Sequence, residues 1–246
     1  MKRFYIPMES IAENKIHIQG EEFHHLKNVL RLKRGSKITV FDGKGKEYSG
    51  RIIELDKNEA VVDIESSRFV LSKDSPYKVT LAQVISKNQK IDFVVQKAAE
   101  LGVDKIIPVS SLRAVVKLDA ELSIAKKNRW QRIAKEASKQ CGRLTVPEVG
   151  DCLNIKEAVA YLKDYDLKLF FCINKETIKL KKVLERFVGK PPETIALFIG
   201  PEGDFTQDEI DLAKDNGCDL VSLGERVLRT ETAGLYVLSI LDYIFN

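Results

Sequence analysis

The part of the chain after Tyr77 alternates apolar segments of strand length with amphipathic segments of helix length. Five buried strands are predicted, over 79–85, 105–109, 168–172, 194–199 and 220–223. Between them, apolar residues recur at helical spacing from Ile91 to Leu101, stop at Gly102, and recur again around Trp130. Because strands that alternate with helices join in parallel, the pattern predicts an α/β domain, a parallel sheet with helices on both faces.

Two further helices are predicted near the C-terminal end. Thr206 and Glu209 have the spacing of a capping box at the start of one of them. The other, over 231–244, carries apolar residues on nearly all sides, namely Leu235, Val237, Leu238, Ile240, Leu241 and Ile244. A helix of this kind must be covered on most faces, by the rest of the fold or by another subunit.

The first seventy or so residues have a different pattern, typical of a small β-barrel. Three short strands separated by turn residues are predicted over 38–41, 48–55 and 60–64. One short helix is predicted after Gly20, where Phe23, Leu26, Val29 and Leu30 recur at helical spacing. A polar segment over 66–76 ends in a proline, so the expected domains are 1–72 and 73–246.

Composition excludes several classes of protein. The net charge of +4 is only a weak indication of a polyanionic partner. No run of about 18 apolar residues is present, and the apolar stretch at the start of the sequence is too short for a signal peptide. A cytoplasmic protein that does not enter the membrane is therefore expected. The four cysteines are scattered without a Cys-x-x-Cys pair, so neither a metal site nor a disulfide framework is expected.

Two loops occupy the positions where α/β proteins bind ligands. Gly200-Pro201-Glu202-Gly203 follows one predicted strand and precedes a capped helix, and 223–230 follows the next strand in the same way. Neither a Walker loop nor a Gly-x-Gly-x-x-Gly pattern is present, which disfavours nucleotide hydrolysis, dinucleotide binding and the common Rossmann-type methyltransferases. Two plainer alternatives stay open. The first loop can be a simple strand-to-helix turn, and Thr230 and Glu231 can be capping residues.

Basic residues gather in two places. On the polar side of the predicted helix around Trp130, they recur at spacings of three and four, at Arg132, Lys135, Lys139 and Arg143. Near the N-terminus they surround a helix end, at Lys27, Arg31, Lys33, Arg34 and Lys37, beside His24 and His25. Either set suits phosphate contacts. Each can equally be a solvated surface, and the histidines are interpreted as structural or surface groups and not as metal ligands.

Several ordered segments together resemble one family, the 16S ribosomal RNA uridine-N3 methyltransferases (RsmE) within the SPOUT class of knotted methyltransferases. They are His24 to Leu26 with Val29 to Leu32, Gln96 to Val103, Ser111 with Arg113, Val115 and Val116, Glu136-Ala137, Gln140 to Arg143, Ile199 to Gly203, and Leu223 to Ala233. The resemblance covers essentially the whole chain.

The resemblance implies a PUA-like barrel that binds RNA, followed by a SPOUT domain with a deep trefoil knot. It also implies a homodimer that methylates 16S rRNA, within the small ribosomal subunit, with S-adenosyl-L-methionine. The implied cofactor residues are Ile199, Gly200, Pro201, Glu202, Gly203, Leu223, Gly224, Val227, Leu228, Thr232 and Ala233. One departure concerns Asp204, which stands where the family usually has a second glycine. Aspartate tolerates a left-handed backbone better than most residues.

Chemical roles follow from the same resemblance. Uridine N3 is a poor nucleophile until its proton leaves, so the site must favour the anion. Arg113, Arg143 and Arg229 are expected to orient RNA or stabilise that anion, and Glu202 or Glu231 to accept the proton or to organise the loop. The expected RNA contacts are His25, Arg31, Arg34, Arg132, Lys139 and Arg143. Two alternatives remain, a non-catalytic RNA-binding protein of ribosome assembly and a related SPOUT methyltransferase that acts on another RNA.

Overall fold

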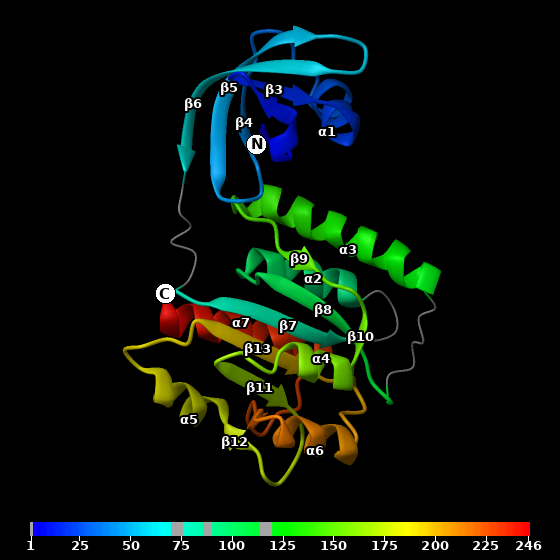
Figure 1. The fold of residues 1–246 in the computed structure, drawn as a ribbon, viewed down its shortest axis with the longest axis vertical. Coiled ribbons are helices and arrows are strands. Elements are labelled where there is room, and N and C mark those ends of the chain that lie inside the picture. Colours follow the sequence, from blue (N-terminus) through cyan, green and yellow to red (C-terminus); the bar gives the residue numbers. More distant parts are fainter. Residues whose placement is uncertain (1, 70–75, 86–89, 114–119) are drawn as a thin grey trace. The chain divides into compact units, whose positions relative to one another are not determined.

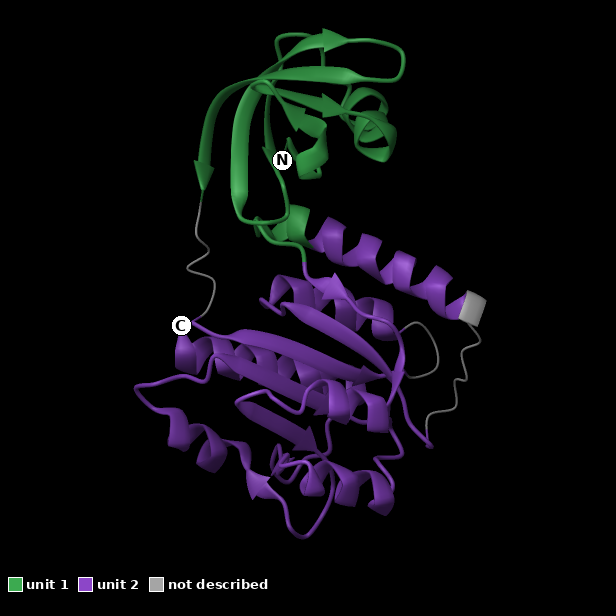
Figure 2. Cartoon of the chain, viewed as in Figure 1, with its two compact units in different colours: residues 1–74, 138–146 green, residues 75–137, 147–246 purple. Residues whose placement is uncertain are grey.

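The computed structural model describes residues 2–69, 76–85, 90–113 and 120–246. It divides into two compact units, one of Met1–Asp74 with Ser138–Val146 and one of Ser75–Ala137 with Pro147–Asn246 (Figure 2). The segment 138–146 belongs to the first unit, although the sequence places it in the C-terminal domain. The expected boundary at 72/73 lies outside the described residues, as do Val115 and Val116.

The first unit contains a six-stranded sheet in the order β1-β4-β5-β6-β3-β2, in which only β1 and β4 pair in parallel. Its strands are β1 (Arg3–Tyr5), β2 (Ile11–Ala12), β3 (Lys15–Ile18), β4 (Lys37–Phe41), β5 (Lys46–Leu55) and β6 (Ala60–Phe69). The predicted strands and the turn between β4 and β5 are confirmed. Asp42 closes that turn, because its Oδ1 accepts hydrogen bonds from the amides of Lys44 and Lys46.

A short helix packs against this sheet, as the apolar spacing after Gly20 predicts. It begins as α1 (Gly20–His24) and continues as a π-helical turn, η2 (His25–Val29). Phe23 and Leu26 are buried in the core of the unit, whereas Val29 is 61% exposed. Val29 is exposed although it shares the helical spacing, since a π turn contains more residues than an α turn and shifts the positions that follow.

The second unit contains a parallel sheet in the order β10-β8-β7-β13-β11-β14-β12, with β9 paired to β8 (Figure 1). Its strands are β7 (Lys78–Val84), β8 (Lys105–Ser110), β9 (Glu148–Val149), β10 (Leu153–Asn154), β11 (Leu167–Phe171), β12 (Ile178–Lys179), β13 (Thr194–Ile199) and β14 (Asp219–Ser222). All five predicted strands are confirmed. The sequence misses β9, β10 and β12, because two residues are too few to produce a strand pattern.

Helices cover both faces of this sheet, as predicted. They are α2 (Lys90–Glu100), α3 (Ala120–Cys141), α4 (Ile155–Tyr161), α5 (Leu180–Leu184), α6 (Gln207–Asp215) and α7 (Thr230–Phe245). One core contains residues of α2, α3, α5 and α7, and the other contains residues of α4 and α6. Alternate residues of β13 face the two cores, with Leu197 in the first and Phe198 in the second. The sheet is buried on both faces, which explains its continuous apolar strands.

The ends of the helices agree with their sequence signals. Gly102, just after α2, has a φ of 89°, and the Thr206–Glu209 capping box at α6 is present in both directions. The last helix α7 is covered on one side, where Val237 and Leu241 are fully buried, while Tyr236 is 46% exposed. Within the described ranges, no helix is both long enough and apolar enough to cross a membrane.

Candidate functional site

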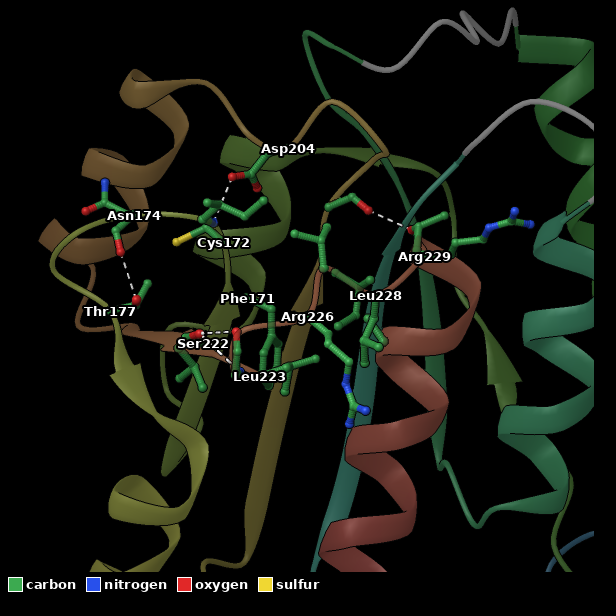
Figure 3. A pocket seen from close by; sticks show the side chains of 18 of the residues that line it. Phe171, Cys172, Asn174, Thr177, Asp204, Ser222, Leu223, Arg226, Leu228 and Arg229 are labelled. Carbon is green, nitrogen blue, oxygen red and sulfur yellow. Dashed lines mark hydrogen bonds between the residues drawn. The ribbon is translucent and has the colours of Figure 1, made fainter.

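A pocket opens where the loops after three neighbouring strands meet the start of α7 (Figure 3). Strands β13, β11 and β14 are consecutive in the sheet, so their carboxyl ends lie side by side. The cavity measures about 380 Å³, within the range typical of small-molecule sites. Apolar side chains, including Phe171, Ile199 and Leu228, share its lining with polar groups such as Asn174 and Thr177.

Most of the cofactor residues implied by the resemblance line this pocket. They are Ile199, Gly200, Pro201, Glu202, Leu223, Gly224, Val227, Leu228 and Ala233. Gly203 and Thr232 do not belong to the lining. The sequence missed the third loop, after β11, which contributes Cys172, Ile173, Asn174 and Thr177. This loop has no glycine to mark it, and its only signal was its place at the end of a predicted parallel strand.

Thr230 joins two parts of the pocket. Its Oγ1 donates a 2.6 Å hydrogen bond to the Gly200 carbonyl and accepts a 2.8 Å bond from Nε2 of Gln83, a buried residue of β7. The N-cap position of α7 is occupied by Arg229, without a side-chain cap. The interpretation of Thr230 as a capping residue is therefore wrong. Its hydroxyl instead connects the Gly200 loop to a central strand.

Two glycines of the pocket are required for different reasons. A Cβ atom at Gly200 would lie 2.9 Å from the Phe205 ring, so this position needs glycine because the ring packs against the backbone. Gly224 has a φ of 113°, a conformation that side chains disfavour, and open space surrounds its Cβ position. The open space around Gly224 leaves its backbone accessible for close approach by a ligand.

Asp204, the departure from the family pattern, adopts a left-handed backbone with a φ of 59°. Its Oδ2 accepts a 2.8 Å hydrogen bond from the amide of Ile173, in the loop after β11 (Figure 3). Cys172 lies beside this contact, and its burial together with the nearby carboxylate of Asp204 raises the pKa of the thiol to about 12. The Cys172 side chain is therefore neutral at physiological pH and is not a nucleophile.

A cluster of charged groups lies beside the pocket. Lys90 Nζ, from the start of α2, is 2.6 Å from Glu202 Oε1 and 3.5 Å from Glu231 Oε2. The hydrogen bond from Lys90 holds the pKa of Glu202 below its ordinary value, and the same bond raises the pKa of Lys90. Glu202 is therefore a carboxylate at neutral pH. Glu231 stands in the first turn of α7, where a carboxylate is favoured, and its Oε2 is buried without a hydrogen-bond partner.

The three predicted arginines occupy different surroundings. Arg113 Nη1 donates hydrogen bonds to the carbonyls of Gly203 (2.9 Å) and Phe205 (3.2 Å), so it holds the backbone of the Gly200 loop. Arg229 is largely exposed, with Nη1 4.0 Å from Glu231. Arg143 belongs to the other unit, where its Nε donates to Thr145 Oγ1. Arg113 and Arg229 thus lie at the pocket loops, and Arg143 lies outside their unit.

The predicted basic ridge is not a single exposed face. Lys139 is buried, and its Nζ lies 3.0 and 3.1 Å from the two carboxylate oxygens of Glu22. Arg143 follows the end of α3 and is not part of the helix. The expectation of a phosphate contact from Lys139 is a misassignment, because helical spacing cannot reveal an acidic partner 117 residues away. Arg132 remains exposed on the helix.

The predicted RNA contacts near the N-terminus lie on and after η2. His25 is half-buried, with its ring centroid 5.8 Å from that of Phe4, whereas Arg31 and Arg34 are exposed. Arg31 has a left-handed backbone, with a φ of 50°. Among the described residues, no group of histidine, cysteine, aspartate and glutamate side chains is arranged to hold a metal ion.

Comparison with known proteins gives consistent matches for both parts of the chain. Residues 73–242 match a family described as RNA methyltransferase domain, and residues 18–65 match one described as RNA methyltransferase PUA domain. Ribosomal RNA small subunit methyltransferase E of Bacillus subtilis is 33% identical, covering 99% of this chain and 96% of that protein.

Solved structures agree with the sequence matches. A Neisseria gonorrhoeae ribosomal RNA small subunit methyltransferase E bound to S-adenosyl methionine superposes with a TM-score of 0.87 at 35% identity, covering 100% of this chain and 98% of that one. A Legionella pneumophila methyltransferase solved in complex with the cofactor SAM gives a TM-score of 0.87 at 36% identity, with coverage of 98% and 97%.

Proposed function

This chain belongs to the RNA methyltransferase family that includes ribosomal RNA small subunit methyltransferase E, and from this premise we propose that it methylates N3 of a uridine in 16S rRNA with S-adenosyl-L-methionine as methyl donor. The pocket at the carboxyl edge of the parallel sheet carries the proposal, because it combines a suitable volume with loops from three strands. The substrate is proposed to be rRNA within the small ribosomal subunit, and the protein is accordingly proposed to be cytoplasmic.

The residues of the pocket fit this cofactor. Apolar walls from Phe171, Ile199 and Leu228 suit an adenine ring, and the open backbone at Gly224 can approach it closely. The cofactor carries a positive charge at sulfur, and the Glu202 carboxylate that lines the pocket carries the opposite charge. When bound, S-adenosyl-L-methionine would supply an electrophilic methyl group.

The remaining steps belong to side chains of the protein. Arg229 is proposed to stabilise negative charge on the target base, because its guanidinium is largely exposed and lies at the start of α7. Arg113 is proposed to support the pocket through its bonds to Gly203 and Phe205. Glu202 is proposed to organise its loop and attract the cofactor, since the bond from Lys90 that lowers its pKa also makes it a weaker proton acceptor.

The proton of uridine N3 is proposed to pass to Glu231 or to water. Replacing Glu231 with glutamine distinguishes the two routes in single-turnover methylation measured across pH. If Glu231 takes the proton, the glutamine variant should lose rate at neutral pH and regain it as rising pH ionises uridine N3 directly. A rate equal to that of the wild type at every pH assigns the proton to water.

The same series includes Arg229→Ala. Its single-turnover rate should fall at least tenfold while cofactor affinity stays within about twofold, because the guanidinium is proposed to act on the base and not on the cofactor. Full activity with unchanged cofactor binding would contradict the role given to Arg229.

RNA is proposed to contact the first unit, which matches the RNA methyltransferase PUA family. Arg31 and Arg34 are exposed there, and His25, Arg132 and Arg143 complete the proposed contacts. Reversing the charge of Arg31 and Arg34 should weaken RNA binding and reduce its dependence on salt, because each phosphate contact releases counterions. An unchanged salt dependence would remove these two arginines from the interface.

The protein is also proposed to form a homodimer through α7. Exposed residues of this helix, Tyr236 and Ile244, line an apolar groove together with Leu184 of α5 and Val188, four residues after the end of α5. An apolar surface of this kind is typical of an interface between subunits. Light scattering at micromolar concentration should give twice the mass of the chain, and Tyr236→Asp should shift it toward the monomer.

One experiment separates the proposed function from its alternatives. Purified protein is incubated with labelled S-adenosyl-L-methionine and small ribosomal subunits that lack the modification, and the methylated nucleotide is mapped. Methylation of uridine N3 in 16S rRNA supports the proposal, and methylation elsewhere identifies a related enzyme with another target. Absence of cofactor binding by calorimetry would instead favour a non-catalytic RNA-binding protein.

A further inference from the structure

The loops after β11 and β13 are joined at the pocket by one side chain. Asp204 follows β13, and its Oδ2 accepts a hydrogen bond from the amide of Ile173, which follows β11 and lies 31 residues earlier. Both residues line the cavity. Because the bond connects a side chain to a main chain, it fixes the course of the Ile173 backbone, whatever the side chain there.

The backbone of Asp204 is fixed on both sides. Its own amide donates a 3.0 Å hydrogen bond to the Pro201 carbonyl, which closes a turn. Arg113 Nη1 bonds the carbonyls of Gly203 and Phe205, the residues before and after Asp204. The carboxylate therefore projects from a rigid segment, so the bond to Ile173 holds the second loop against a fixed support.

The loop that receives this bond is also ordered by its own contacts. The Asn174 carbonyl accepts hydrogen bonds from the amide (3.3 Å) and Oγ1 (2.8 Å) of Thr177, and Asn174 Oδ1 accepts from the amide of Glu176 (2.9 Å). Asn174 and Thr177 both line the pocket. A bond at Ile173 therefore positions the whole turn, including the two polar side chains that it presents to the cavity.

The left-handed conformation at residue 204 gives this bond a cost that glycine would avoid. Asp204 has a φ of 59°, which is unfavourable for residues with a Cβ atom, although aspartate and asparagine tolerate it better than the others. A glycine would relieve the backbone but could not reach Ile173. Aspartate at this position therefore accepts an unfavourable backbone conformation and gains a hydrogen bond across the pocket.

We propose that Asp204 is a positioning residue that sets the shape of the cofactor pocket by holding the Ile173–Thr177 turn against the Gly200 loop before the cofactor binds. The inference rests on the proposed function, in which this pocket binds S-adenosyl-L-methionine. A preformed wall lowers the cost of binding, because the turn loses less conformational freedom when the cofactor binds.

Three substitutions separate positioning from charge. Asp204→Asn keeps both the tolerance of a left-handed backbone and an oxygen that accepts from Ile173, and its affinity for S-adenosyl-L-methionine should stay within about twofold of the wild type. Asp204→Gly loses the acceptor and should bind about tenfold more weakly by calorimetry, with the melting temperature unchanged or higher. Asp204→Ala loses the acceptor and keeps the strain, so it should bind as weakly as the glycine variant and melt at a lower temperature.

Kinetics and amide exchange supply readouts that a purely structural role would leave unchanged. The glycine variant should show a raised KM for the cofactor with kcat near that of the wild type, because the reacting groups are untouched. In the protein without cofactor, the Ile173 amide should be protected from hydrogen exchange and should lose that protection in Asp204→Gly. Asp208→Asn, on the exposed start of α6, is the matched control for loss of one negative charge.

The outcomes separate the proposed function of the pocket from the positioning role of Asp204. If the wild-type protein does not bind S-adenosyl-L-methionine, the proposed function fails, whatever the exchange rate at Ile173. If the wild type binds and Asp204→Gly binds equally well, the positioning role is overturned while the function stands. If Asp204→Asn is as weak as Asp204→Gly, the negative charge, and not the hydrogen bond to Ile173, is what the pocket requires.

Discussion

Replacing Thr230 with valine removes one hydroxyl group and leaves the shape of the side chain nearly unchanged. That hydroxyl donates to the Gly200 carbonyl at 2.6 Å and accepts from Gln83 Nε2 at 2.8 Å. Gln83 is 1% exposed, and its Nε2 keeps only a longer bond, 3.2 Å, to the Val84 carbonyl. Valine at this position therefore breaks two hydrogen bonds, one of which involves a fully buried amide.

The expected loss of stability follows from these contacts. Two hydrogen bonds contribute about 1 kcal/mol each, and leaving the buried Gln83 donor poorly satisfied adds up to about 1 kcal/mol more. The free energy of unfolding should therefore fall by roughly 2–3 kcal/mol. Because Gly200 lines the pocket, its released carbonyl should also loosen the loop and weaken S-adenosyl-L-methionine binding.

Urea denaturation followed by tryptophan fluorescence measures this change in the relevant unit. Trp130 is the only tryptophan of the sequence and is buried in the core that contains α7. Thr230→Ser keeps the hydroxyl and should recover most of the loss, whereas Thr232→Val, on the exposed side of the same helix, is the stability control. A loss below about 0.5 kcal/mol in Thr230→Val would refute the role of the bridging hydroxyl.

Three other predictions follow from buried or perturbed groups. Lys139→Met removes the ammonium group that pairs with the buried Glu22 carboxylate and should cost about 3–5 kcal/mol in unfolding free energy. A double variant with Glu22→Leu should restore most of this loss, and thermal unfolding by circular dichroism checks both. Iodoacetamide at pH 8 should label the exposed Cys141 and leave Cys172, whose thiol has a pKa of about 12, unlabelled by mass spectrometry. Hydrogen bonds from Thr194 hold the pKa of Asp166 below its ordinary value, so the ionised carboxylate stabilises the fold at neutral pH. This stabilisation is lost as the pH falls through the folded pKa of Asp166. The difference in melting temperature between wild type and Asp166→Ala should therefore close below about pH 4.

The sheet of the second unit was predictable because its strands are buried on both faces. Runs such as 194–199 contain no polar interruption, so they stand out without knowledge of the strand order. The order itself, which places β11 between β13 and β14, does not follow from spacing. As a result, two of the three pocket loops were identified and the loop after β11 was missed.

Errors at single residues share one physical cause, namely a partner far away in sequence. Thr230 has the sequence context of a capping residue, yet its hydroxyl is used by Gly200 and by Gln83, 147 residues away. Lys139 has the spacing of an exposed basic residue, yet Glu22 neutralises it in the core of the first unit. Local patterns report which side chains are available for a contact, and tertiary packing decides which contact each one makes.

The same principle explains how the Gly200 loop keeps its shape although it has no regular secondary structure of its own. Its carbonyls are bonded by Arg113 and Thr230, which come from segments distant in sequence, and Asp204 connects its far end to the next loop. These three side chains act on main-chain groups, so they fix the course of the loop backbone independently of the apolar side chains that line the pocket. Substitutions at the three supports should therefore affect cofactor affinity more than conservative changes at apolar lining positions such as Leu228, where another hydrophobic side chain of similar size fills the same space.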